Sequence, residues 1–314
     1  MAGQIVTDWD TTKIAEFGRR PMRFRHRVHE SELFSDESLA RLIERAPRDC
    51  YYVNTMDIAS NDRRTRREGE FGGARGEEVL AAVRGGRIWV MLLYPERTDA
   101  RYGQLLEDIY AEIEAKVPTL RVRKKKISIL ISSPDIPVFY HCDLAGQTLW
   151  QVRGQKTVYV YPNREPFLPQ PHLERIVLNE AHEISLPYDS AWDRSAEVFT
   201  IEPGDMLHWP LNAPHRIQNG PCVNVSFTTE HLTPEVRRNY VTHYGNGILR
   251  RVLHMQNLSP STSGPRYWTK LATMAAARAL ALQKGREQVF KVDFAVDPKS
   301  PGGFRDIPAY EFRK

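Results

Sequence analysis

Polar and apolar residues alternate with a period of two for about a hundred residues after Lys126. This alternation is typical of strands with one buried face, and Pro, Gly and Asn punctuate it. It predicts eight strands, at residues 127–133, 138–143, 148–153, 157–161, 197–201, 205–209, 215–218 and 223–229. Eight short strands separated by turns indicate an antiparallel sandwich or barrel, and the number suits a double-stranded β-helix, or jelly roll.

Helical spacing of apolar residues flanks this block. It predicts helices at 30–46, with Ser35 or Asp36 as the cap, and at 102–117, 236–244 and 267–284. A buried strand is expected at 87–94, a mobile loop at 59–77, and a Pro/Gly-rich tail at the end. We therefore expect a mainly β protein with flanking helices. Its predicted parts are a basic arm (1–35), a helical and strand bracing region (36–126), a β-barrel core (127–232) and a C-terminal helical region (233–314).

Composition narrows the class of protein. With 41% hydrophobic and 26% charged residues, the chain of 314 residues is neither disordered nor fibrous. Its cysteines, Cys50, Cys142 and Cys222, are too scattered for a disulfide framework or a thiolate zinc site. The N-terminus shows no secretory signal pattern, and no apolar run reaches the roughly 20 residues of a membrane span. We expect a cytoplasmic protein with no membrane partner.

The net charge of +5 is concentrated in three basic clusters, at residues 19–27, 63–67 and 121–126. Such clusters could contact nucleic acid or an acidic protein. No nucleic-acid-binding motif accompanies them, so a solvated surface is the favoured interpretation. Nucleic acid is therefore an unexpected partner, although charge alone leaves it open.

The candidate chemistry begins at His141 and Asp143. Two residues apart in a predicted strand, they project to the same face, while Cys142 points away. An imidazole and a carboxylate together with one further imidazole form the facial triad that binds Fe(II) and leaves other coordination positions open. An isolated His-x-Asp pair is weak evidence in a chain of ten histidines.

A second block supplies the third ligand, and here the sequence resembles the cupins. Their second motif places Gly, Pro, Gly, His and Asn at spacings matched by Gly204, Pro210, Asn212, His215 and Asn219. Asn212 replaces a glycine, and Asn is the residue that best tolerates positive φ. The resemblance favours His215 as the third ligand over the competing His208.

The first cupin motif is matched by Asp135, His141, Asp143, Gln147 and Gly154, with Asp143 in place of a histidine and Gln147 in place of a glutamate ligand. The stretch from His141 to Pro162 resembles the JmjC-type hydroxylases. In that family a lysine fifteen residues after the first histidine holds the distal carboxylate of 2-oxoglutarate, which is the position of Lys156. A compact cation suits that dianion.

The resemblance also suggests cosubstrate contacts at Ser226 and Gln147, where family members tend to carry asparagine. In the strand 223–229, Asn224, Ser226 and Thr228 share one face, which would line the pocket while the apolar face meets the flanking helices. Other candidates for the pocket wall are Thr148, Trp150 and Trp209. The segment 163–192 joins the two motifs and is expected to reach the substrate.

The sequence thus predicts a cupin-like, JmjC-type oxygenase that uses Fe(II) and 2-oxoglutarate, with His141, Asp143 and His215 as ligands and catalytic residues. The resemblance implies hydroxylation of a C–H bond in a protein side chain, RNA or metabolite, and a homodimer formed by the C-terminal helices. One alternative is a metal- and ligand-binding sensor without turnover. Another is a cupin whose metal activates an organic substrate directly, without 2-oxoglutarate.

Overall fold

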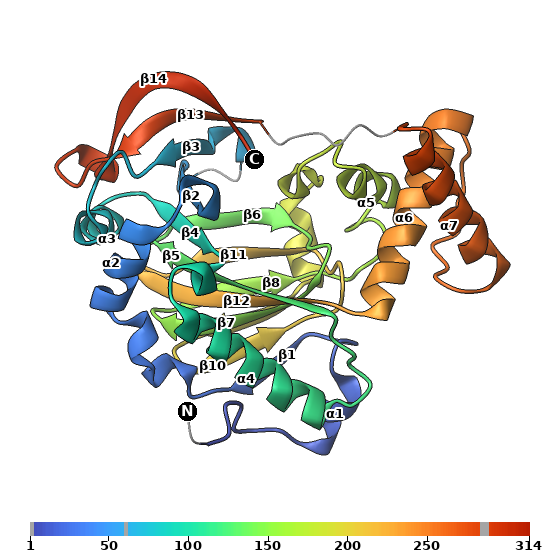
Figure 1. Ribbon diagram of the computed structural model, residues 1–314, viewed down its shortest axis with the longest axis horizontal. Helices are drawn as coiled ribbons and strands as arrows, with labels where there is room; N and C mark the ends of the chain where they lie inside the picture. Colours follow the sequence, from blue (N-terminus) through green and yellow to red (C-terminus); the bar gives the residue numbers. More distant parts are fainter. Residues whose placement is uncertain (1–2, 60–61, 283–288) are drawn as a thin grey trace.

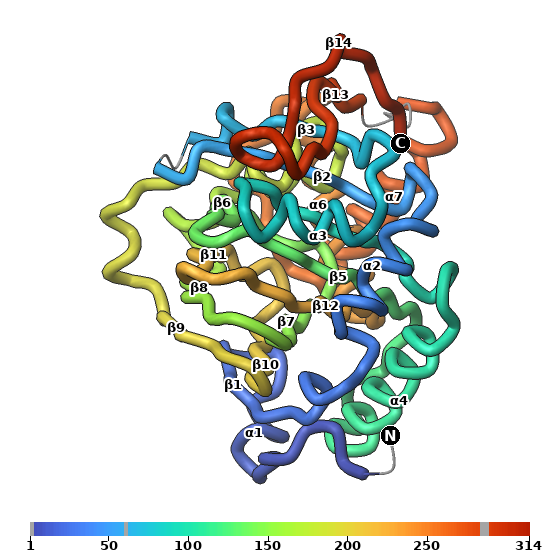
Figure 2. Tube along the Cα trace, turned by 90° about the vertical axis from the view of Figure 1, so that its left-hand side faces the viewer, coloured from blue at the N-terminus to red at the C-terminus, as the bar shows by residue number. Residues whose placement is uncertain are grey.

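Two sheets, antiparallel except for one parallel pair of strands in the larger one, face one another at the centre of the protein (Figure 1). The computed structural model describes residues 3–59, 62–282 and 289–314. The smaller sheet contains, in spatial order, β6 (Pro137–His141), β11 (His215–Asn219), β8 (Lys156–Val160) and β9 (Glu197–Ile201). Figure 2 shows these strands stacked along one side of the molecule.

The larger sheet has ten strands among the described residues. In spatial order they are β1 (Met22–Arg25), β10 (Asp205–His208), β7 (Gly146–Arg153), β12 (Asn224–Leu232), β5 (Lys124–Ser132), β4 (Trp89–Leu93), β2 (Tyr51–Thr55), β3 (Arg67–Glu70), β13 (Val289–Val296) and β14 (Phe304–Arg313). All eight strands predicted from the alternation are present, as β5 to β12. They divide equally between the two sheets, and the protein is mainly β with flanking helices as expected.

The space between the sheets holds a small apolar core. Leu149 and Leu207 from the large sheet meet Val158 and Ile217 from the small one. These inward residues alternate with outward ones along each strand, as a two-layer β structure requires. The core fills one part of the interior and leaves the rest to the pocket described below.

Helices cover the outer face of the large sheet. The helices in the first part of the chain are α1 (Thr11–Glu16), α2 (Asp36–Arg45), α3 (Gly76–Gly85) and α4 (Ala100–Lys116). Ser35, one of the two caps that the sequence predicted, caps α2 by accepting a hydrogen bond from the backbone N–H of Ser38, so the α-helix begins at Asp36 and not at residue 30. Leu39, Val79 and Ile109 from three of these helices share one core with Phe227 of β12. This cover explains why β12 carries apolar residues on its outer face.

The remaining helices are α5 (Gln170–Val177), α6 (Pro234–Leu253) and α7 (Gly264–Ala279). They pack together with Tyr140 and Tyr161 at one end of the small sheet, and α6 and α7 project from the body (Figure 1). Both predicted C-terminal helices are therefore present, although 283 and 284, the last residues predicted for the second, lie outside the described residues. No helix within the described ranges is long and apolar enough to cross a bilayer.

Three segments differ from expectation. The described part of the basic arm contains β1, which pairs with β10 and buries Phe24. The predicted loop 59–77, of which 60 and 61 lie outside the described residues, contains β3. The expected tail, including part of the predicted C-terminal helical region, forms the hairpin of β13 and β14 against β3. Gly69 of β3 lets this hairpin approach closely, because a Cβ there would lie 2.3 Å from the Phe294 ring.

Candidate metal centre

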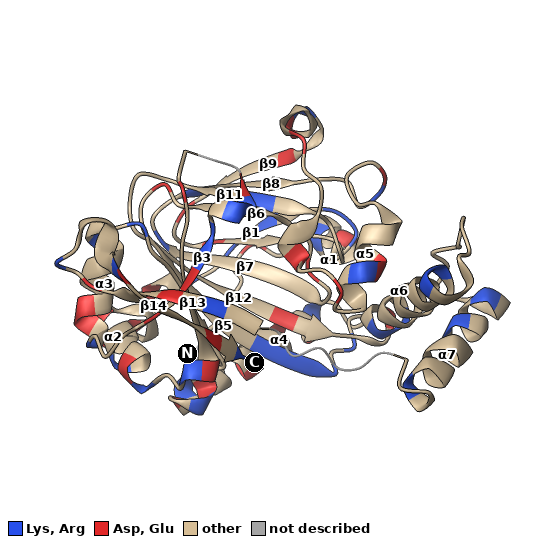
Figure 3. Cartoon of the chain, turned by 90° about the horizontal axis from the view of Figure 1, so that it is seen from above, with Lys and Arg blue, Asp and Glu red and all other residues tan. Residues whose placement is uncertain are grey.

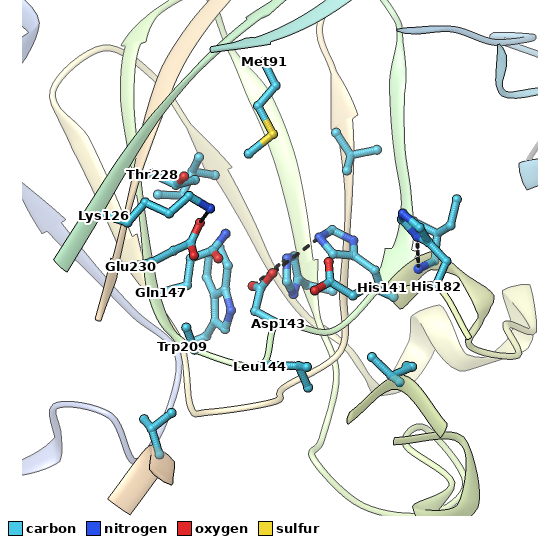
Figure 4. A pocket seen from close by; sticks show the side chains of 18 of the residues that line it. Met91, Lys126, His141, Asp143, Leu144, Gln147, His182, Trp209, Thr228 and Glu230 are labelled. Carbon is cyan, nitrogen blue, oxygen red and sulfur yellow. Dashed lines mark hydrogen bonds and ion pairs between the residues drawn. The ribbon is translucent and has the colours of Figure 1, made fainter. Parts of the chain in front are cut away.

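His141, Asp143 and His215 come together at one end of the small sheet. His141 ends β6 and His215 begins β11, and the two residues are paired in register. The Nε2 atoms of His141 and His215 lie 3.9 and 3.5 Å from different oxygens of the Asp143 carboxylate. One ligand atom from each of the three residues lies within 4.8 Å of the others (Figure 4). Two imidazoles and a carboxylate in this arrangement could hold one divalent cation on one side.

Backbone carbonyls orient both imidazoles. His141 Nδ1 lies 2.7 Å from the carbonyl oxygen of Phe139, and His215 Nδ1 lies 3.1 Å from that of Ala213. A carbonyl only accepts hydrogen bonds, so each Nδ1 carries the proton. Each neutral ring therefore turns the lone pair of Nε2 toward Asp143. Outer hydrogen bonds of this kind are typical of metal-binding histidines.

The electrostatics also suit a cation. Burial lowers the pKa of His141, and burial together with His141 lowers the pKa of His215 well below its usual value. Both rings are therefore neutral, as metal ligation requires. Burial, followed by the nearby Glu230 carboxylate, raises the pKa of Asp143 to about 8. A divalent cation between these groups would supply the positive charge that the buried carboxylate lacks.

The competing ligand, His208, lies elsewhere. It belongs to β10, where its Nδ1 is 2.8 Å from the carbonyl oxygen of Gln147 and 3.0 Å from Thr148 Oγ1. Its ring stacks on Phe17 at a centroid distance of 4.0 Å. The structure thus brings His215, and not His208, to the pair on β6.

Two further side chains border the triad. The Gln147 amide donates to both Asp143 oxygens, at 3.1 and 3.2 Å, in the orientation that satisfies both side chains. The Trp209 ring lies 4.5 Å from the His215 ring. Gln147 was predicted to touch the cosubstrate, and the structure places it against the carboxylate of Asp143 (Figure 4). It is therefore suited to orienting that ligand.

Lys156 lies deep in the same pocket. It is 3% exposed, and its Nζ donates a 2.9 Å hydrogen bond to Ser226 Oγ. Burial lowers its pKa to about 7. Thr228, two residues along β12, also lines the pocket, and its buried hydroxyl has no hydrogen-bond partner among the described residues. Among the described residues, the Lys156 ammonium group has no carboxylate and the Thr228 hydroxyl no partner, which fits an anionic ligand such as the distal carboxylate of 2-oxoglutarate.

The pocket that contains the triad has a volume of about 1400 Å³. Besides the triad it is lined by Gln147, Lys156, Thr228 and Trp209, all of which the sequence singled out. The segment 163–192 lies at this pocket too, where it contributes α5 residues and Glu183. Burial and the proximity of Asp143 raise the pKa of Glu183 to about 7.

Three predicted wall residues do not line the pocket. Trp150 is fully buried in the outer core, where it stacks on Phe227 and donates a hydrogen bond to Thr229. Thr148 shares that outward face of β7 and contacts His208. Asn224 points inward but accepts a hydrogen bond from Gln151 at the closed end. The outward placement of Thr148 and Trp150 follows from the pleat, because Gln147 and Leu149 occupy the inner face.

Sequence reasoning did not identify several pocket residues. Glu230 and Lys126 form a 2.9 Å ion pair on adjacent strands, and Arg66 and Phe290 come from distant parts of the chain. Lys126 was predicted only as part of a basic cluster. The inward face of β12 already contained the signal for Glu230, which is two residues beyond Thr228.

No protein-family model and no curated protein sequence matches the chain. Among solved structures, it is similar to an X-ray structure of Escherichia coli YcfD, with 15% identity over 91% of this chain and 70% of that one, at a TM-score of 0.52. It is similar also to YcfD, described as a ribosomal oxygenase, in complex with cobalt and 2-oxoglutarate (14% identity, 88% and 68% coverage, TM-score 0.51). The complex of YcfD with cobalt and succinic acid gives 14% identity, 90% and 69% coverage and a TM-score of 0.50. The chain therefore shares its fold with an oxygenase.

Proposed function

We propose that this protein is an Fe(II)- and 2-oxoglutarate-dependent oxygenase that hydroxylates a C–H bond of its substrate. The observation that carries the proposal is the two-imidazole, one-carboxylate group at the base of a pocket that also holds the buried Lys156. The similar YcfD structures, which contain cobalt with 2-oxoglutarate or with succinic acid, support it. In the overall reaction, O₂ supplies one oxygen atom to the substrate C–H bond and one to 2-oxoglutarate, which leaves as succinate and CO₂.

In this proposal, different side chains bind the iron, orient its carboxylate ligand and bind the cosubstrate. His141 and His215 through Nε2, with the Asp143 carboxylate, would hold the iron, which when bound supplies the oxidising power together with 2-oxoglutarate. Gln147 keeps the Asp143 carboxylate in place through its amide hydrogen bonds. Lys156 and Thr228 would bind the distal carboxylate of the cosubstrate. Trp209 packs beside His215, with 4.5 Å between the ring centroids, and would help to fix the orientation of that ring.

The finer architecture belongs to the same proposal. We infer that β5 to β12 form the cupin type of double-stranded β-helix, because these eight strands divide equally between the two facing sheets. The predicted divisions at 35, 126 and 232 stay part of this proposal, as does a cytoplasmic location. So does a homodimer through the C-terminal helices, where Leu253, Trp268 and Leu280 are exposed on α6, on α7 and at the α7 C-cap.

The test is an anaerobic titration of the metal-free protein with Fe(II) and then 2-oxoglutarate, monitored by visible absorption. Chelation of the iron by the cosubstrate is expected to produce a metal-to-ligand charge-transfer band. Lys156→Ala should require more 2-oxoglutarate for the same band. Stoichiometric iron without a band would contradict the proposal, and a band without succinate formation in air would favour a binding protein without turnover.

A further inference from the structure

Four cationic side chains stand at the mouth of the metal-site pocket. Lys124 begins β5 and Arg123 directly precedes it, and Arg237 and Arg238 lie in the first turns of α6. All four line the pocket and are exposed. Figure 3 shows blue along the first part of β5, beside β12. We refer to these four residues as the cationic rim.

The cationic rim is poorly neutralised by the protein itself. Within the described ranges, none of its four members has a carboxylate within ion-pair distance, whereas Lys126, deeper in the pocket, is paired with Glu230. Arg238 lies over the Tyr267 ring, 5.7 Å from its centroid. Arg237 and Arg238 also lie near the N-terminus of α6, where the helix dipole disfavours positive charge. Cations in such a position favour the binding of a ligand that brings negative charge to the pocket mouth.

Strand register gives the depth of the cationic rim. Glu230 pairs with Lys126 on one side and with Gln147, which contacts Asp143, on the other. Two residues further out, Leu232 pairs with Lys124. At about 3.3 Å per residue this is a step of roughly 7 Å, and the first turn of α6 adds about 5 Å. The cations therefore lie roughly 7–12 Å outside the level of the triad.

The interior of the pocket restricts the kind of anion. Beside the triad, Glu183 lines the pocket and Lys126 is already paired with Glu230, so negative charge on the reacting part of the substrate would meet a carboxylate without gaining a new cation. A polynucleotide carries a phosphate at every residue and would bring such charge close to these carboxylates. A polypeptide can present one carboxylate at a chosen distance and keep its other residues neutral. An extended peptide advances about 3.3 Å per residue, so roughly 7–12 Å corresponds to two to four residues.

We propose that the substrate is an extended polypeptide segment with an Asp or Glu two to four residues from the residue that is hydroxylated, and that the cationic rim binds this acidic side chain. The inference rests on the proposed function, because it assumes that the reacting residue sits at the triad. It deepens that function by naming the class of substrate and its charge pattern.

The experiment uses the Co(II)-loaded protein and a set of peptides anchored at the metal. Each peptide is made of Gly and Ser, carries one hydroxamate side chain that chelates the metal, and has one Glu placed one to six residues away on either side. Affinity is measured by displacement of a fluorescent hydroxamate in 50 mM salt. We expect a maximum at two to four residues on one side, at least ten-fold above the peptide without Glu.

Charge reversal tests the residues. R123E/K124E and R237E/R238E are separate variants of exposed positions, and each should abolish the maximum while the peptide without Glu still binds. The matched control, R19E/R20E, reverses two exposed arginines in the N-terminal part of the chain and should keep the maximum within two-fold. Melting temperatures of all variants verify that they are folded.

The outcomes separate the two proposals. Equal affinity for every Glu position, or a maximum that survives both rim variants, overturns the cationic rim and leaves the oxygenase proposal standing if the wild-type protein shows its charge-transfer band. Failure of every hydroxamate peptide to bind, together with the lack of that band, overturns the proposed function and this inference with it. A fluorescein-labelled dodecauridylate that binds more tightly than the best peptide, and loses affinity in the rim variants, overturns the assignment to a polypeptide.

Discussion

Replacing Lys156 with Met should stabilise the ligand-free protein and weaken cosubstrate binding. Lys156 is 3% exposed, and its ammonium group donates a 2.9 Å hydrogen bond to Ser226 Oγ. Burial lowers its pKa from 10.5 to about 7, which corresponds to a cost of ~4 kcal/mol in folding free energy at pH 7. Met fills a similar volume but leaves the Ser226 hydroxyl without its partner, at a cost of about 1–2 kcal/mol. The net gain in the free energy of unfolding is therefore about 2 kcal/mol.

The lowered pKa of Lys156 also determines how the free energy of unfolding should change with pH. Between pH 7 and 10.5 the unfolded chain keeps a proton on Lys156 that the folded protein has released, so wild-type stability rises with pH in this window. Below pH 7 both states are protonated, and the full cost remains. Lys156→Met lacks this group, so its advantage should shrink as the pH rises from 7 to 10. Urea unfolding at pH 6, 7, 8.5 and 10 measures both effects, with the exposed Lys124→Met as the control.

Two results would refute the reasoning. A variant that is no more stable than the wild type at pH 7 would show that the buried ammonium group is not costly. Stability curves that run parallel from pH 7 to 10 would show that Lys156 does not titrate in this range. In either case, the charge of a buried Lys156 would no longer explain why Lys156→Met binds 2-oxoglutarate more weakly.

His215→Ala should abolish Co(II) binding in calorimetric titration, because His215 belongs to the triad. His208, which does not, should be replaceable by Ala with the affinity kept within about three-fold. Equal losses in the two variants would contradict the ligand assignment. Metal affinity should fall by up to about ten-fold per pH unit below pH 8, since Asp143 has a pKa of about 8 and must lose its proton to bind. Competition with a chelator from pH 6 to 8 measures this, and a flat profile would argue against it. Trp150→Ala should lower the free energy of unfolding by about 3–5 kcal/mol without changing 2-oxoglutarate affinity in the folded protein, because Trp150 packs in the outer core. Denaturant unfolding and titration test the two parts.

Periodicity predicted the positions of the strands, but it could not decide for every strand which face points into the pocket. In β12 the polar and apolar residues alternate cleanly, so the inward placement of Thr228 and the outward placement of Phe227 could be inferred. In β7 both faces are apolar in part, because Leu149 lines the inner core and Trp150 the outer one. Such a strand carries no signal for which face meets the pocket. The pocket roles expected for Trp150 and Thr148 failed for this reason.

Contacts between distant segments were beyond the reach of local patterns. Arg66 and Glu183 line one pocket although more than a hundred residues separate them. The hairpin of β13 and β14 pairs with β3, whose charged and Gly-rich sequence indicated a loop. Here Arg67 joins the three strands by hydrogen bonds to Asp293 and Asp306. A strand that is held by its partners rather than by apolar residues does not show the usual alternation.

Three inward side chains of β12 lie at successive depths of the pocket, from its closed end toward its mouth. Ser226 accepts the hydrogen bond of Lys156, Thr228 offers a hydroxyl without a partner among the described residues, and Glu230 pairs with Lys126 nearest the mouth. Alternate residues of a strand lie about 7 Å apart, so these three positions span roughly 13 Å from the closed end outward. The cosubstrate would then lie at the level of Ser226 and Thr228, and the metal at the level of Glu230, which pairs with Gln147 beside Asp143. Because the two levels depend on different inward side chains, changes at Ser226 should act on 2-oxoglutarate and changes at Glu230 on the substrate, while the triad residues themselves stay unchanged.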